Sequence, residues 1–81
     1  MQSERAKLLI AIYRLGSKDA LGEADQAQAQ KDAGLSDEQA LPLLAQLHQL
    51  GFLKVQGVSV GSLKLTGSGI NAAKRAIGGD A

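Results

Sequence analysis

One glycine-serine string and one histidine are the residues that most invite a chemical interpretation. Gly57-Val58-Ser59-Val60-Gly61 has the Gly-x-Ser-x-Gly spacing that presents a nucleophilic serine on a strand-to-helix turn. Such a serine needs a histidine base nearby, and here the string links two expected strands. The only histidine, His48, falls on an expected helix. We therefore do not expect Ser59 to act as a catalytic nucleophile.

A second string, Gly67-Ser68-Gly69-Ile70-Asn71-Ala72, matches the Gly-x-Gly-x-x-Ala pattern of dinucleotide-binding turns. That site also requires a further strand and an acidic residue about twenty positions on, which this sequence does not supply. A single histidine without neighbouring acids, in a chain without cysteine, gives no metal site. The sequence predicts a binding module without cofactor or metal, and not an enzyme.

Length and composition indicate one domain. With 81 residues the chain has interior for a single core, so we expect one domain over residues 1–81, with 1–2 and 78–81 as flexible tails. The absence of cysteine fits a reducing compartment. The longest apolar run, Leu8 to Tyr13, is far too short to span a bilayer, and no signal-peptide pattern is recognisable. We expect a cytoplasmic protein without a membrane segment.

Charge is segregated along the chain although the total is only +1. Residues 1–18 carry a net charge of +3, residues 19–38 carry −5, and residues 39–81 carry +3. The acidic segment therefore lies in the middle, between two basic ones.

The first expected helix covers Ala6 to Leu15, with Ser3 as its cap and Gly16 as its end. Its core stripe has helical spacing and consists of Leu8, Ile12 and Leu15. The other side of the helix is apolar as well, at Leu9, Ile10 and Tyr13. A helix that is apolar on more than one side usually has more than one partner, so we expect this side to meet a second protomer.

The second expected helix, Ala24 to Ala33, follows a short connection at residues 20–22 and stops at Gly34. Leu35 is a buried turn residue, and Ser36 with Gln39 forms a capping box that opens the third helix.

The third expected helix ends at Gly51, and Pro42 within it predicts either a kink or a later start. Its apolar face consists of Leu43, Leu44, Leu47 and Leu50.

A hairpin and a last helix complete the expected order. Phe52 to Gln56 and Ser62 to Thr66 alternate apolar and polar residues around the loop 57–61. If the register centres on Ser59, Lys54 and Lys64 stand opposite each other on the solvent side. The closing helix is capped by Thr66 or Ser68, runs through Ile77, and turns Ile70, Ala73 and Ile77 inward.

Three strings resemble the winged helix-turn-helix family, in its short-wing bacterial and archaeal regulator branch. They are Ala33-Gly34-Leu35-Ser36, Leu44-x-x-Leu47-x-x-x-Gly51-Phe52-Leu53 and Leu65-Thr66-x-x-Gly69. The resemblance spans nearly the whole chain and implies an α+β fold, mainly helical, with a three-helix core, a two-stranded wing and a C-terminal helix. One departure is Gln30, at a position where the family usually has a small residue.

The family resemblance implies that the third helix enters the major groove of double-stranded DNA and that the wing contacts the flanking backbone. Gln46 and Gln49 are suited to adenine edges and the lysines to phosphates. The full set expected to bind DNA is Lys31, Ser36, Gln39, Gln46, Gln49, Lys54 and Lys64. A homodimer would double this small basic footprint, through a seam formed by Leu9, Ile10, Tyr13, Ile70 and Ile77. The expected role is transcriptional regulation or DNA architecture.

A protein-binding module is the alternative. The third helix offers no arginine or lysine for guanine and carries Asp37 and Glu38 where phosphates would approach, although both acids also suit a helix N-terminus. In this alternative the partner meets the acidic surface of the second and third helices and the wing tip, which Val58 and Val60 make apolar. The chain is equally compatible with being one domain of a larger regulator or enzyme.

Overall fold

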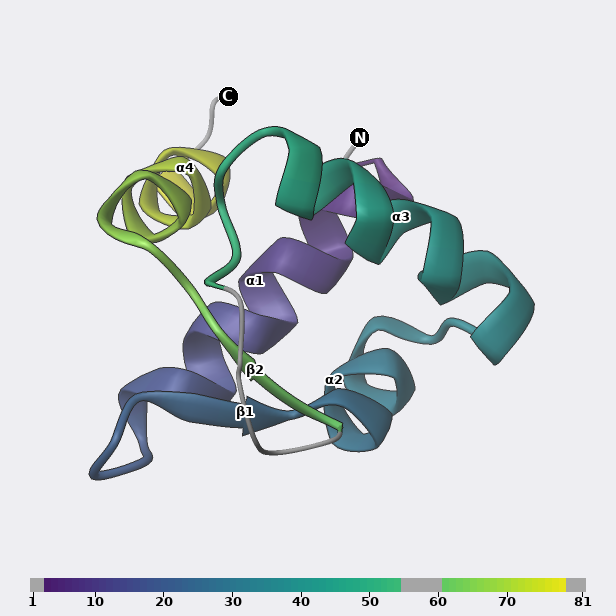
Figure 1. Cartoon of the computed structure of the whole chain (residues 1–81), viewed down its shortest axis with the longest axis horizontal. Helices are drawn as coiled ribbons and strands as arrows, with labels where there is room; N and C mark the ends of the chain where they lie inside the picture. The colour runs from purple at the N-terminus through teal and green to yellow at the C-terminus, as the bar shows by residue number, and fades with distance from the viewer. Residues whose placement is uncertain (1–2, 55–60, 79–81) are drawn as a thin grey trace.

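The computed structural model describes residues 3–54 and 61–78 and has the expected class, mainly helical with a small antiparallel β component (Figure 1). The elements, in chain order, are α1 (Glu4–Ser17), β1 (Glu23–Asp25), α2 (Gln26–Ala33), α3 (Asp37–Gln49), β2 (Ser62–Lys64) and α4 (Gly67–Gly78). None of these helices has the length and apolarity needed to cross a membrane, as far as the described residues extend.

Helix α1 is the centre of the fold. It contacts α2, α3, α4 and both strands, and it buries five consecutive residues, Leu8 to Ile12. A buried run longer than one helical turn means that neighbouring elements cover most of the helix, although Lys7 and Arg14 stay exposed. Leu9 and Ile10, on its second apolar side, are already buried within this chain. Their burial therefore does not require a second protomer.

Both ends of α1 follow from local chemistry. The hydroxyl of Ser3 accepts a hydrogen bond from the backbone N–H of Ala6, as expected for an N-cap. Gly16 does not end the helix, which continues to Ser17. Because a side chain on Gly16 would meet the carbonyl oxygen of Gly22 at 3.0 Å, this glycine instead allows the following turn to fold back closely.

Strand β1 was not expected from the sequence, which predicted that the second helix begins at Ala24. It pairs antiparallel with β2, Glu23 opposite Lys64 and Asp25 opposite Ser62. Three residues are too few to show an alternating pattern, and only pairing with a segment about forty residues away makes them a strand. Asp25 then caps α2, whose first residue is Gln26.

The turn between α2 and α3 is as predicted. Gly34 has a positive φ of 74°, Leu35 is buried, and the reciprocal hydrogen bonds of the capping box join Ser36 and Gln39. The alternative of a later start for α3 is wrong, since the helix begins at Asp37 and includes Pro42. Its inner stripe is Ala40, Leu44 and Leu47, whereas the expected core residue Leu50 is 49% exposed.

The expected hairpin register is confirmed at one position, but the expected strand Phe52–Gln56 is not formed over residues 52–54, where only Leu53 makes an isolated bridge. Leu53 pairs with Leu65, and the backbone N–H of Lys54 donates to the carbonyl of Lys64 at 2.8 Å. Leu53, Leu63 and Leu65 are buried, as their alternation predicted. Residues 55–60, which include Val58, Ser59 and Val60, lie outside the described part of the chain.

Helix α4 packs along α1 and is anchored at its start (Figure 1). Thr66 caps it by accepting a hydrogen bond from the N–H of Gly69 at 3.0 Å, and Gly78, expected in the tail, is its last residue. Gly69 is buried against Phe52, where a side chain would overlap the Phe52 backbone. Ala73 faces inward as predicted, but Ile77 is 43% exposed, because α4 turns Gly69 and Ala73 toward the core.

Candidate functional site

Two of the side chains expected to bind DNA hold the start of α3 together. The Ser36 hydroxyl accepts from the N–H of Gln39 at 3.3 Å, and the Gln39 side chain accepts from the N–H of Ser36 at 3.0 Å. The amide nitrogen of Gln39 also donates to a carboxylate oxygen of Glu4 at 3.3 Å. Ser36 and Gln39 therefore serve the helix start, and base contacts would have to displace these bonds.

Gln46 is also engaged within the chain, because it accepts a hydrogen bond from the Arg5 guanidinium at 3.4 Å. Three further candidates are exposed: Lys31 on α2, Gln49 on α3 and Lys54 after α3. Lys64 is half-buried, with its aliphatic chain beside the turn at Gly22.

A backbone hydrogen bond joins Lys54, which lies after α3 and outside any strand, to Lys64 on β2, so the two lysines are neighbours as expected. Like charges at opposite positions of a strand pair repel, but Lys64 also lies opposite Glu23 on β1, whose carboxylate offsets part of that repulsion. These two lysines are the part of the predicted DNA site that the geometry favours.

The outward side of α3 is apolar and acidic. We call it the α3 outer face and define it by five exposed residues on the side of the helix opposite Ala40, Leu44 and Leu47: Glu38, Leu41, Pro42, Ala45 and Gln49. Leu41 is 57% exposed, and no lysine or arginine occurs anywhere from Asp37 to Gln49. Among the described residues no hydrogen bond or ion pair engages the Glu38 carboxylate. The face therefore offers an apolar contact beside an unpaired negative charge.

Leu41 was not singled out by the sequence pattern. The signal was present, because Leu41 lies about 100° around the helix from Ala40 and so away from the centre of the stripe that continues through Leu44 and Leu47. In a helix with four leucines, however, the periodicity alone did not show which ones turn inward.

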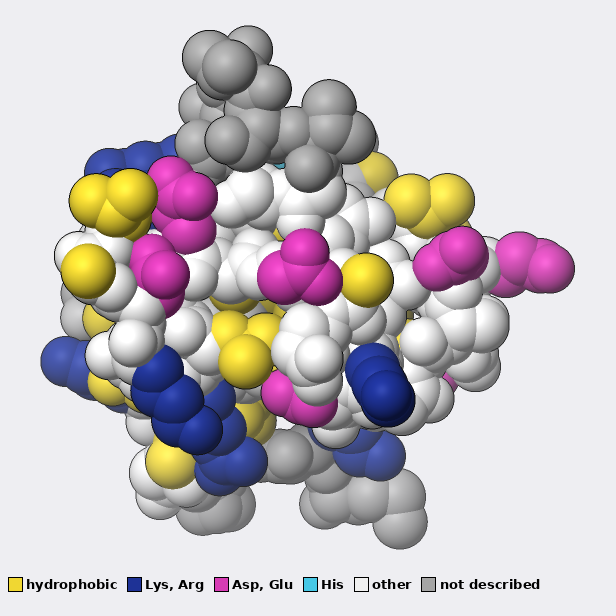
Figure 2. Space-filling view, turned by 90° about the horizontal axis from the view of Figure 1, so that it is seen from below, with side chains coloured by type: hydrophobic (Ala, Val, Ile, Leu, Met, Phe, Trp, Pro, Cys, Tyr) yellow, Lys and Arg dark blue, Asp and Glu magenta, His cyan; other side chains and the backbone are white. Residues whose placement is uncertain are grey.

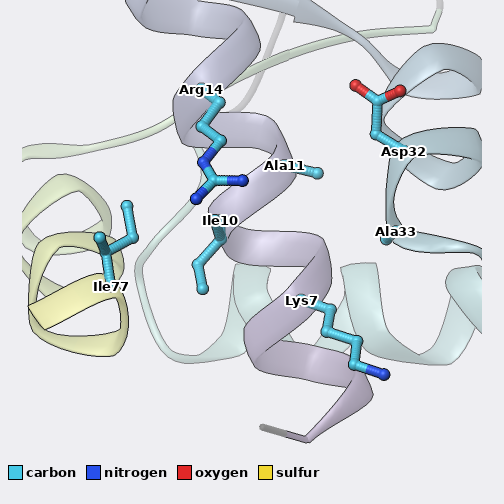
Figure 3. A pocket seen from close by; sticks show the side chains of 7 residues that line it. All are labelled: Lys7, Ile10, Ala11, Arg14, Asp32, Ala33 and Ile77. Atoms are coloured by element: carbon cyan, nitrogen blue, oxygen red, sulfur yellow. The ribbon is translucent and has the colours of Figure 1, made fainter. Parts of the chain in front are cut away.

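A second surface feature is a groove of about 450 Å³ that runs across α1. Figure 3 shows it from close by, with α2 on one side and α4 on the other. We call it the α1 groove; its lining residues are Lys7, Ile10, Ala11, Arg14, Asp32, Ala33 and Ile77.

Charge and apolar surface also meet in the α1 groove. The Arg14 guanidinium bends toward Ile10 and Ile77, and the Asp32 carboxylate turns toward α1 from the opposite wall (Figure 3). The described residues contain no ion pair to Lys7 or Arg14, while Asp32 accepts a hydrogen bond from Gln28 at 2.8 Å. Two unpaired cations thus border an apolar floor.

The face seen in Figure 2 is mixed in charge. Acidic side chains cross the middle of this face, most of the lysine and arginine side chains lie on one side of them, and apolar side chains are visible in between. The segregation of charge along the sequence is therefore carried partly into space.

The residues expected at the dimer seam have different surroundings. Leu9 and Ile10 are only 5% and 6% exposed, whereas Ile77 is 43% exposed. Tyr13 and Ile70 are half-buried and line a smaller pocket of about 220 Å³ together with Leu65 and Lys64. Most of the expected seam is therefore the packing of α1 against α4 within one chain, and dimerisation itself stays a prediction.

Of the two glycine-rich strings, the one around Ser59 falls on residues 55–60 and so lies outside the described residues. Within residues 3–54 and 61–78 no group of three histidine or acidic side chains is placed to hold a metal ion. The string that begins at Gly67 forms the first turns of α4. Comparison of the chain with protein-family models, curated proteins and solved structures found no match.

Proposed function

We propose that this chain is a winged helix-turn-helix domain that binds another protein through the α3 outer face. The order of elements supports the fold assignment: α2, a tight turn and α3 are followed by a returning strand that pairs with β1 before α4. The proposal is of a binding module, without a catalytic role.

The observation that carries the proposal is the character of the α3 outer face. Leu41 is 57% exposed beside exposed Pro42 and Ala45, and the helix has no lysine or arginine. A helix that reads DNA must approach phosphates, whose negative charge dominates the binding energy, and α3 instead brings Asp37 and Glu38. Three of the expected base-contacting or supporting side chains, Ser36, Gln39 and Gln46, are engaged within the chain.

The chemistry of the face defines its partner. An apolar side chain of the partner would contact Leu41 and Pro42, and a lysine or arginine would meet Glu38, whose charge has no counterpart in the described residues. We therefore expect the partner to present a basic and apolar surface.

The test is co-purification from cells that contain the native protein, with tagged wild type and two variants compared side by side. Leu41→Glu should remove a specific partner, whereas Leu21→Glu, at a leucine that is 68% exposed in the turn before β1, should retain it. A partner retained equally by both variants, or no partner with either, would contradict the proposal.

Double-stranded DNA is the second candidate, favoured by the pairing of Lys54 with Lys64. It is tested by fluorescence anisotropy with random duplex DNA at several salt concentrations. The protein-binding proposal predicts no salt-dependent binding. A log-log slope corresponding to roughly four phosphates, abolished by Lys54→Glu with Lys64→Glu, would establish the DNA function instead.

A further inference from the structure

The two surface features of this chain are complementary to each other. The α3 outer face presents Leu41 with a free carboxylate three residues before it, at Glu38. The α1 groove presents Ile77, which is 43% exposed, with the free guanidinium of Arg14 beside it (Figure 3). Each surface therefore pairs one exposed aliphatic side chain with one charge that has no ion-pair partner within residues 3–54 and 61–78, and the two charges are opposite.

We infer that a second copy of this chain binds in the α1 groove through its α3 outer face, and that the copies associate head to tail. This inference rests on the proposed role of α3 as a protein-binding helix and names its partner. Leu41 of one copy then packs against Ile10 and Ile77 of the next, and Glu38 pairs with Arg14.

The arrangement of the helices excludes the same contact within one chain. Helix α3 packs against α1 and turns its outer face away from it. Figure 3, which looks onto the α1 groove, shows α3 behind α1, and in Figure 1 α3 passes in front of α1. The groove and the α3 outer face thus lie on opposite sides of α1, so each can be filled only by another molecule.

The spacing of the groups fits a helix in the groove. Glu38 and Leu41 are three residues apart, about 4.5 Å along a helix, and lie on neighbouring positions of its surface. Arg14 bends toward Ile10 and Ile77, so that its guanidinium and the apolar floor are also neighbours (Figure 3). Charge also favours binding of the acidic α3 outer face in the groove, because the groove has two cations, Lys7 and Arg14, against one acid, Asp32.

Head-to-tail contact has a consequence that a two-fold dimer does not have. The two surfaces in contact are different, so each added copy leaves one free surface at either end. The interface uses one face of one helix and is small, which predicts weak association that increases with protein concentration.

Complementary variants test the inference by sedimentation velocity between about 10 µM and about 1 mM, a range suited to a small interface. The average mass of the wild type should rise from 8.4 kDa toward at least twice that value. Leu41→Glu and Ile77→Glu should each stay monomeric. An equimolar mixture of the two should form a dimer and nothing larger, because only one pair of intact surfaces remains.

Two controls keep this experiment specific. Leu21→Glu should associate like the wild type, and circular dichroism should show that every variant is folded. Arg14→Glu should weaken association at least tenfold, and Glu38→Arg in the same chain should restore it.

Several results would overturn the inference. They are a wild type that stays monomeric at about 1 mM, a mixture that fails to dimerise, or a Leu41→Glu variant that still dimerises while Ile77→Glu does not. The last result would indicate a two-fold seam at α4. If a different partner is lost with Leu41→Glu while the wild type remains monomeric, the self-association fails and the proposed function stands.

Discussion

Helices α1 and α3 have nearly the same length, 14 and 13 residues, but they have opposite places in the molecule. Helix α1 buries five residues in a row and contacts every other element, whereas α3 buries Ala40, Leu44 and Leu47 in one stripe. Apart from the half-buried Leu43, the other residues of α3 are exposed. Both helices are rich in large aliphatic residues, with three leucines and two isoleucines in α1 and four leucines in α3. Apolar content alone therefore does not tell a scaffold helix from a presenting helix; the number of elements packed around it does.

The largest effect should come from shortening the buried Ile10 of α1, and the same change at the exposed Leu41 of α3 should have little effect. Ile10→Ala should lower the free energy of unfolding by about 2–5 kcal/mol, because a buried side chain leaves a cavity. Leu41→Ala should change it by less than about 0.5 kcal/mol. Urea unfolding followed by circular dichroism measures both. Equal costs would show that the two helices are covered alike.

A smaller effect is expected where α4 is fixed in position to cover α1. Gly69→Ala should destabilise the fold by about 1–3 kcal/mol, because the added methyl group overlaps the backbone of Phe52. Gly67→Ala is the matched control in the same helix, since open space surrounds that position. The difference in thermal unfolding midpoint between the two variants reports on this contact, and a tolerated Gly69→Ala would argue against close packing there.

The start of α3 depends on local bonds more than on packing. Ser36→Ala should cost about 1 kcal/mol, the usual value of a lost N-cap. Ser68→Ala, an exposed serine in the first turn of α4 rather than its cap, should be nearly neutral. Amide hydrogen exchange should show faster exchange confined to the first turn of α3 in Ser36→Ala. Uniform acceleration over the whole chain would mean that this turn is part of the global folding unit.

The smallest effect concerns the strands, the competing location for a binding site. Lys54→Glu should raise the free energy of unfolding by about 0.2–1 kcal/mol, because an attractive pair with Lys64 replaces a repulsive one. Lys54→Gln should give a smaller gain, and both gains should shrink in high salt. Urea unfolding at two salt concentrations measures them. Destabilisation by Lys54→Glu would contradict the opposed placement of the two lysines.

Much of the fold was predictable because it depends on neighbours in the sequence. The caps at Ser3, Ser36 and Thr66 and the left-handed turn at Gly34 are set by side chains that bond to backbone groups within a few residues. The register that joins Leu53 to Leu65 follows from alternation and from the length of the connection. These features hold whatever surrounds them.

The candidate site was only partly predictable, because most of its contacts join residues that are far apart in the sequence. The sequence determined that α3 carries two acids and no cation. Only the tertiary structure decided that Gln39 and Gln46 bond to residues of α1, that Ile10 is buried and that Ile77 is exposed. It also made a strand of Glu23–Asp25 by pairing it with Ser62–Lys64. Burial and long-range pairing depend on which elements meet in space, and local periodicity does not indicate which elements those are.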